Sequence, residues 1–459
     1  MNNREKKLAK NTIIFGIGNF ATKFISFFLV PLYTYCLTTS EYGKIDLLFT
    51  ISTFLFPLLT LNITEAIFRY SLDNSKKIDG IQCIGLTCFA LASIVGLISI
   101  PALNIFIEYK PLSLYFYLYL VTLSMCQMLL VCLKGQSKIK EFALGNFLNA
   151  LLIAILNIIF LIKYNMGISG YFLAYIISNV VISIYSIYVG KFNHIIKEFY
   201  FDKKLFKEMT KYSLVLLPTS FMWWIINSSD RVMISVFENE SAMGIYAVSY
   251  KIPSLLTTIA SVFTQAWLFS AIDEKNSSDI ELYTNKIFKK FFIFLIFVAN
   301  FTICFIKIAF KFYVSNEFYT AWKYVPFLII GFVFMNMSTF ISTSYNVHKD
   351  SKGFLYSGIV GAISNIILNF ILIPYYAVYG AAFATMCSYI IVFIYRLCDT
   401  KKYIKLKITS ELLISMIVLL FIAALTYFNG KIYFVIQFIL ALAFSVYYLP
   451  LLVKTIQKK

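Results

Sequence analysis

Long apolar runs recur from one end of the chain to the other, separated by short polar segments. Most runs reach roughly 18 residues or more, enough for a helix to cross a hydrocarbon core of about 30 Å. Backbone groups in lipid must bond within their own segment, so such runs indicate membrane-spanning helices rather than open strands. The pattern predicts about fourteen spans, at roughly residues 11–36, 45–69, 81–105, 112–133, 142–163, 167–190, 212–236, 243–270, 287–310, 323–346, 353–374, 378–397, 408–428 and 432–453.

The chain also contains an internal repeat. Glu41–Ile45 follows the first span and the similar Ala242–Tyr246 follows the seventh. Leu156–Asn157 and Gly170 in the fifth and sixth spans recur as Leu368–Asn369 and Gly380. The sequence therefore predicts an all-α membrane protein with two six-helix lobes related by a pseudo-twofold axis, enclosing a central cavity. The expected parts are residues 1–200, 201–400 and a pair of additional spans in 401–459.

Charge sets the predicted orientation. With the N-terminus placed in the cytoplasm, 30 of the 40 Lys and Arg residues fall in or beside cytoplasmic segments. This bias follows the positive-inside rule and predicts a multi-pass protein of the bacterial inner membrane with both termini cytoplasmic. The net charge of +18 is then explained by orientation and by contact with anionic lipid headgroups, so no nucleic-acid partner is expected.

Chemical motifs for catalysis or cofactors are missing from the sequence. The eight cysteines form no CxxC pair and the two histidines, His194 and His348, are far apart, so no metal or other cofactor is expected. There is no phosphate-binding loop of the Walker type, no GxSxG and no HExxH motif. Loops outside the spans are too short for a soluble catalytic domain. The protein is therefore predicted to be a transporter rather than an enzyme.

Polar residues at three- and four-residue spacing mark the first two spans of each half. A helix that lines a watery cavity needs such a stripe, whereas a helix in lipid does not. The candidate substrate-binding residues on these stripes are Asn19, Lys23, Asn62, Arg69, Asn227, Arg231, Lys251, Ser254, Thr258 and Gln265. Glu65 and Asp230 are candidates for ion coupling or for a gate.

Most of the charged residues within the predicted spans also have an explanation that does not involve a substrate. Lys23 lies about twelve residues, or roughly 18 Å, from the predicted cytoplasmic end, too deep to reach the surface easily. Lys251 is closer to a surface and could extend its ammonium group to it. Arg69 could equally pair with Glu65 one turn away. Asp230 and Arg231, near the outer end of their span, could be an interfacial pair.

Several segments resemble polysaccharide flippases of the multidrug/oligosaccharidyl-lipid/polysaccharide (MOP) superfamily, of the O-antigen and capsule type. The resemblance covers at least the first twelve spans. It rests on Leu37-Thr38-Thr39-Ser40-Glu41-Tyr42-Gly43, Glu65-Ala66-Ile67-Phe68-Arg69-Tyr70, Asn227-Ser228-Ser229-Asp230-Arg231 and Gly244-Ile245-Tyr246-Ala247-Val248-Ser249-Tyr250-Lys251-Ile252-Pro253.

This resemblance implies that the protein moves an undecaprenyl-diphosphate-linked oligosaccharide from the cytoplasmic to the outer leaflet. It suggests membrane lipids, a polysaccharide polymerase and a chain-length regulator as partners. Lys23 and Lys251 would bind the diphosphate, and the Ser, Thr, Asn and Gln stripes would bind the sugars. The alternatives are a drug or cation antiporter of the same superfamily, a membrane polysaccharide polymerase and, as a close variant, a lipid II flippase.

Overall fold

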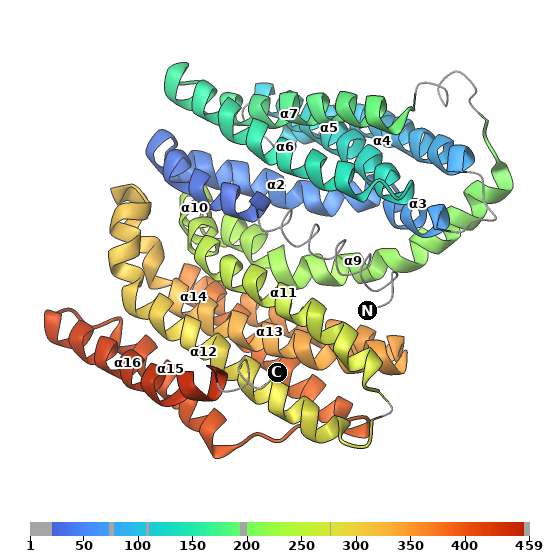
Figure 1. Cartoon of the computed structure of the whole chain (residues 1–459). Helices are drawn as coiled ribbons and strands as arrows, with labels where there is room; N and C mark the ends of the chain where they lie inside the picture. Colours follow the sequence, from blue (N-terminus) through green and yellow to red (C-terminus); the bar gives the residue numbers. More distant parts are fainter. Residues whose placement is uncertain (1–20, 73–77, 107–109, 193–199, 276, 454–459) are drawn as a thin grey trace. The chain divides into compact units, whose positions relative to one another are not determined.

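The structure is a computed structural model that describes residues 21–72, 78–106, 110–192, 200–275 and 277–453. Within these ranges the chain is helical and contains no β-strand. It divides into two compact units, Met1–Trp224 and Ile225–Lys459, with the boundary inside one long helix (Figure 1). The prediction of an all-α membrane protein is confirmed.

The first unit builds its core around helix α5. Cys126, Leu130 and Leu133 of α5 are fully buried among residues of the neighbouring helices α3, α4 and α7. Figure 1 shows α4, α5, α6 and α7 running side by side. The described helices of this unit are residues 21–36, α2 (Thr39–Leu59), α3 (Ile63–Ser71), α4 (Ile78–Phe106), α5 (Lys110–Gly135), α6 (Ile139–Asn157), the π-helical turn η1 (Ile158–Lys163), α7 (Gly167–Gly190) and the start of α9 (Lys203–Phe237).

The second unit is organised around α13, which packs against α11, α12 and α14 and is buried along most of its length. Helices α15 and α16 pack against α12 in this same unit. Its elements are the end of α9 (Lys203–Phe237), α10 (Glu240–Ser249), α11 (Lys251–Asp273), α12 (Ile280–Tyr313), η2 (Asn316–Lys323), α13 (Val325–His348), α14 (Ser351–Asp399), η3 (Thr400–Lys402), α15 (Ser410–Leu425) and α16 (Lys431–Val453).

The predicted spans coincide with helices throughout the described ranges. Ten helical ranges have both the length and the hydropathy of a membrane span, and Ser351–Lys402 among them contains two predicted spans. These two meet at Ala377, where a left-handed φ of 49° breaks α14. The three remaining predicted spans correspond to residues 21–36, to α9 and to α15. The described part of the chain is therefore that of a multi-pass membrane protein.

Two predicted spans are interrupted helices. The second divides into α2 and α3 at Leu61 and Asn62, which both have a φ of 53°. The eighth divides into α10 and α11 at Tyr250. A proline lies within one turn of each break, Pro57 before the first and Pro253 after the second. Because proline cannot donate a backbone hydrogen bond and crowds the preceding turn, Pro253 favours the break at Tyr250. The break at Leu61 and Asn62 comes after Pro57 and is made by the positive φ of those two residues.

The repeated glycines have the same role in both units. A Cβ atom on Gly380 would lie 2.3 Å from the carbonyl oxygen of Leu372, and one on Gly170 would lie 2.8 Å from Cβ of Met166. Each glycine thus allows a helix to start close to the end of the preceding one. The repeat found in the sequence therefore corresponds to a repeated close approach of consecutive helices.

Candidate functional site

Helix α11 separates its side chains into a buried face and an open face. Its buried residues are Pro253, Leu256, Ala260, Thr264, Trp267 and Ala271, which follow a three- and four-residue spacing. The polar stripe lies on the other side, because Ser254 and Leu256 are about 200° apart around the helix axis. Lys251, Ser254 and Thr258 are half-buried, and Gln265 is exposed. The second unit therefore does not use this stripe to build its own core.

The hydroxyl groups of the stripe are held along the helix. Ser254 Oγ donates to the carbonyl oxygen of Lys251 at 2.8 Å, and Thr258 Oγ1 donates to that of Ser254 at 2.9 Å. Ser261 Oγ repeats the pattern, donating to the carbonyl oxygen of Thr258 at 2.7 Å. Each hydroxyl oxygen keeps its lone pairs for a further donor, such as a sugar hydroxyl. The stripe therefore presents hydroxyl oxygens that are able to accept hydrogen bonds from a polar ligand.

Asp230 is the most enclosed of the predicted site residues. Its side chain is 1% exposed. Its Oδ2 accepts hydrogen bonds from Tyr246 Oη at 2.5 Å, Tyr250 Oη at 3.2 Å and Thr385 Oγ1 at 3.2 Å. The structure thus brings α9, α10 and α14 together around one carboxylate. A buried carboxylate with hydroxyl partners is able to take up and release a proton or to contribute to a cation site.

A second layer of hydrogen bonds extends this cluster. Tyr389 Oη donates to Asn227 Oδ1 at 3.2 Å, and Ser229 Oγ donates to Asn365 Oδ1 at 3.0 Å. Arg231 belongs to the same cluster: its backbone N–H donates to Asp230 Oδ1 at 2.9 Å, and its guanidinium carbon lies 5.1 Å from the centre of the Tyr250 ring. Asn227, Asp230 and Arg231 were predicted from the sequence as part of one polar stripe. The structure places all three inside one hydrogen-bonded cluster of the second unit.

Sequence reasoning missed the tyrosines that complete this cluster. Tyr246 and Tyr250 are four residues apart, as are Thr385 and Tyr389, so each pair lies on one helix face. That spacing was available in the sequence, but most tyrosines of a membrane protein lie at the lipid interface. Only the packing of α14 against α10 shows which tyrosines turn inward.

The candidates in the first unit differ in exposure. Lys23, Glu65 and Arg69 are exposed side chains, and Asn19 lies outside the described residues. Asn62 is 6% exposed and occupies the left-handed break between α2 and α3. Its Nδ2 has no hydrogen-bond partner in the described part of the chain. Asparagine tolerates the left-handed region better than most residues, which accounts for its place at this turn.

The comparisons with known proteins agree on a family and a fold. The family described as "Polysaccharide biosynthesis protein" matches residues 8–274, more than half of the chain. No match was found among curated proteins. The structure is similar to that of lipid II flippase MurJ in an inward closed conformation, with a TM-score of 0.72, 18% identity and coverage of 96% of this chain and 99% of MurJ.

Multidrug transporters share the same fold. An inward-facing multidrug resistance MATE family transporter of the MOP superfamily matches with a TM-score of 0.64, 15% identity and coverage of 85% of this chain and 95% of that one. A MOP superfamily transporter from Pyrococcus furiosus matches with a TM-score of 0.57, 16% identity and coverage of 86% and 96%. These folds are those of transporters and flippases, not of enzymes. The chain belongs to the polysaccharide biosynthesis protein family and has the membrane-transporter fold of the MOP superfamily.

Proposed function

We propose that this protein is a flippase that carries an undecaprenyl-diphosphate-linked oligosaccharide from the cytoplasmic to the outer leaflet of the bacterial inner membrane, for assembly of O-antigen, capsule or exopolysaccharide. The observation that carries the proposal is the open polar stripe of α11, headed by Lys251. A stripe of hydroxyl and amide groups is costly against lipid, so it needs water or a polar ligand. Family membership favours a sugar-bearing ligand.

The substrate's diphosphate requires cations as it crosses the membrane. Lys23 in the first unit and Lys251 in the second each offer an ammonium group that replaces part of the hydration of the diphosphate. Arg69 and Arg231 are further anion contacts, while Asn19, Asn62, Asn227, Ser254, Thr258 and Gln265 bond to the sugars. An inside-negative potential favours outward movement of the anion by about 2.3 kcal/mol per charge per 100 mV.

Asp230 and Glu65 are our candidates for coupling transport to an ion gradient. Asp230 is the stronger candidate because its environment is protected from solvent and supplied with hydroxyl groups. The same carboxylate is the feature that most favours the rival function, a drug or cation antiporter. Its burial argues against that function, since an oxygen enclosed by Tyr246, Tyr250 and Thr385 is not presented on an open helix face to a large cation.

Transport by inside-out membrane vesicles tests these assignments. Lys23→Ala and Lys251→Ala are expected to lower the movement of lipid-linked repeat units by about tenfold each, which corresponds to about 1.4 kcal/mol. Lys→Arg at each site should retain most of the activity because the charge remains. Asp230→Asn should remove the dependence on an imposed ion gradient. Full activity of the double Ala variant at normal protein levels would exclude these lysines as diphosphate ligands.

Control substrates separate the rival functions. The proposed flippase should move lipid-linked repeat units in preference to lipid II, and it should not export cationic dyes. Dye export that survives in both lysine variants but fails in Asp230→Asn would instead identify a cation antiporter. Repeat units that become joined in vesicles containing only this protein would identify a polymerase.

A further inference from the structure

The second unit contains a pocket that the proposed transport path does not use. It lies where the ends of α11 and α13 and the beginning of α12 meet residues 403–409, the non-helical segment that joins η3 to α15 and that we call the strap. The pocket has a cavity volume of about 70 Å³. Its aromatic lining includes Trp267, Phe340 and Tyr403. A cavity of this size has room for a few water-sized polar groups, such as the oxygens of a phosphate.

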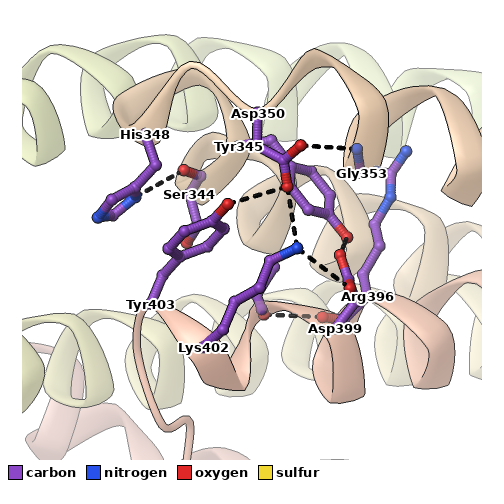
Figure 2. A network of polar contacts seen from close by, with 10 residues as sticks. Ser344, Tyr345, His348, Asp350, Gly353, Arg396, Asp399, Lys402 and Tyr403 are labelled. Carbon is purple, nitrogen blue, oxygen red and sulfur yellow. Dashed lines mark hydrogen bonds and ion pairs between the residues drawn. The ribbon is translucent and has the colours of Figure 1, made fainter.

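The strap is anchored firmly enough to form a wall. Lys402 Nζ lies 3.0 Å from Asp350 Oδ2 and 3.3 Å from Asp399 Oδ1. Tyr403 Oη donates to Asp350 Oδ2 at 2.9 Å, and the His348 ring stacks on the Tyr403 ring at 4.1 Å with an interplanar angle of 12°. Figure 2 shows these side chains converging between the end of α13 and the end of α14.

A single amide side chain on α12 fixes the rest of the strap. Asn285 Nδ2 donates to the carbonyl oxygen of Lys405 at 3.0 Å, and Asn285 Oδ1 accepts from the backbone N–H of Lys407 at 2.7 Å. As a result Ile404 and Leu406 line the pocket, whereas Lys405 and Lys407 are exposed. The alternation of apolar and basic residues thus gives the strap an apolar inner side and a basic outer side.

The interior of the pocket contains a buried threonine hydroxyl. Trp267 stacks on Phe340 at 4.8 Å, and its indole nitrogen already donates to Thr343 Oγ1 at 3.0 Å. Thr284 also lines the pocket and is 3% exposed. Its hydroxyl has no hydrogen-bond partner within the described residues. A buried polar group without a partner is costly, so this hydroxyl favours a ligand that carries an acceptor.

The pocket has a lysine in its lining and lies at the end of membrane spans. Lys275 lines the pocket and is exposed. The three helices that form the walls are candidate spans that end or begin there: Glu240–Asp273, Ile280–Tyr313 and Val325–His348. The pocket is therefore at the level of lipid headgroups, in the leaflet that the predicted topology assigns to the cytoplasm. Basic residues at that level attract anionic lipids.

We propose that this pocket binds the headgroup of an anionic phospholipid from the adjacent leaflet. Lys275 attracts the phosphate. Thr284 donates its hydroxyl to an acceptor oxygen of the lipid, and the wall of Trp267 and Phe340 contacts the glycerol and the first methylene groups. This site is separate from the polar stripe of α11, because Trp267 belongs to the buried face of that helix. The proposal does not depend on which substrate is transported.

Trp267 provides a direct reporter of this site. The full chain is placed in nanodiscs in which either phosphatidylglycerol or phosphatidylcholine carries bromine on its acyl chain, at equal mole fraction. Subtracting the fluorescence of a Trp267→Phe variant isolates the emission of Trp267. Brominated phosphatidylglycerol is expected to quench this emission more strongly. Lys275→Gln and Thr284→Val should each weaken the preferential binding by about tenfold, the effect of losing one bond to a charged group.

Matched controls make the result specific. Lys311→Gln neutralises an exposed lysine near the other end of α12 and should leave quenching unchanged. Thr284→Val keeps the shape of the side chain and removes an unpartnered hydroxyl, so the fold should be preserved and circular dichroism should match. Equal quenching by the two lipids would overturn the proposal. Loss of quenching on adding inorganic phosphate or a polyprenyl diphosphate would also overturn it, by assigning the site to that other phosphate source.

Discussion

The hydroxyl groups around Asp230 offset the cost of burying its charge. A carboxylate at membrane depth costs about 2.5–3.5 kcal/mol. Hydrogen bonds to a charged group each contribute about 1.5–3 kcal/mol. The oxygen–oxygen distances differ within the cluster, 2.5 Å to Tyr246 and 3.2 Å to Tyr250. The shorter bond should therefore contribute more.

Phenylalanine substitutions test this order at the residue scale. Tyr246→Phe is expected to lower the free energy of unfolding by about 2–3 kcal/mol, and Tyr250→Phe by about 1 kcal/mol, because each leaves Asp230 with one donor fewer. The measurement is thermal or denaturant unfolding of the purified protein in one detergent. Tyr188→Phe, at a tyrosine that is 81% exposed, is the control and should change little. Equal losses at Tyr246 and Tyr250 would contradict the geometric ranking.

At the scale of elements, Asp350 joins three segments of the second unit. It caps the start of α14, where its Oδ1 accepts the backbone N–H of Gly353 at 2.9 Å, and it holds the strap through Lys402 and Tyr403. The Gly353 N–H, then the Lys402 ammonium and the Tyr403 hydroxyl, lower the pKa of Asp350 to about 2. Its folded pKa is thus below the unfolded value of about 3.9.

This shift predicts a pH dependence with a definite sign. The charged form of Asp350 stabilises the fold above about pH 4, and this contribution is lost as the pH falls toward 2. Asp350→Asn retains a capping side chain but removes the charge. The difference in melting temperature between wild type and Asp350→Asn should be clear at pH 6 and should shrink at pH 3. Asp273→Asn, at an exposed residue, serves as the reference. A difference that grows on acidification would contradict the assignment.

At the scale of the whole molecule, each unit buries its own core and each is crossed by several membrane spans. The distribution of basic residues predicts which ends of those spans face the cytoplasm. By that prediction the end of α11, with Asp273, is cytoplasmic, and η2, with Glu317, is outside. Both residues are exposed, so both are suitable for chemical labelling.

Cysteine labelling in intact cells tests the orientation. Asp273→Cys and Glu317→Cys are made in a Cys398→Ser background, because Cys398 is an exposed thiol. A membrane-impermeant maleimide should label Glu317→Cys in intact cells and Asp273→Cys only after permeabilisation. The labelling difference should exceed about tenfold, since the bilayer blocks a charged reagent. The reverse pattern would place both termini outside.

Much of the fold could be predicted because the relevant signals are local. Apolar run length located the spans, including the two that meet at Ala377, and the repeated glycines marked equivalent close approaches. Asn149 bonds to Ser178 and Asn179 of the neighbouring helix α7. Asn146 instead donates to the carbonyl oxygen of Phe142 in its own helix. The residue type gave no means of distinguishing these two asparagines.

The sequence by itself determined that this is a helical membrane protein. It also determined where the spans lie and which face of α11 is polar. Both could be predicted because periodicity and run length depend only on near neighbours along the chain. The tertiary structure decided which distant residues share a site. Asp230 and Thr385 are 155 positions apart, and the pocket of the second unit needs four separate segments. Such partners are selected by packing of whole helices, since many helix faces are apolar enough to pair and only one arrangement fills the core.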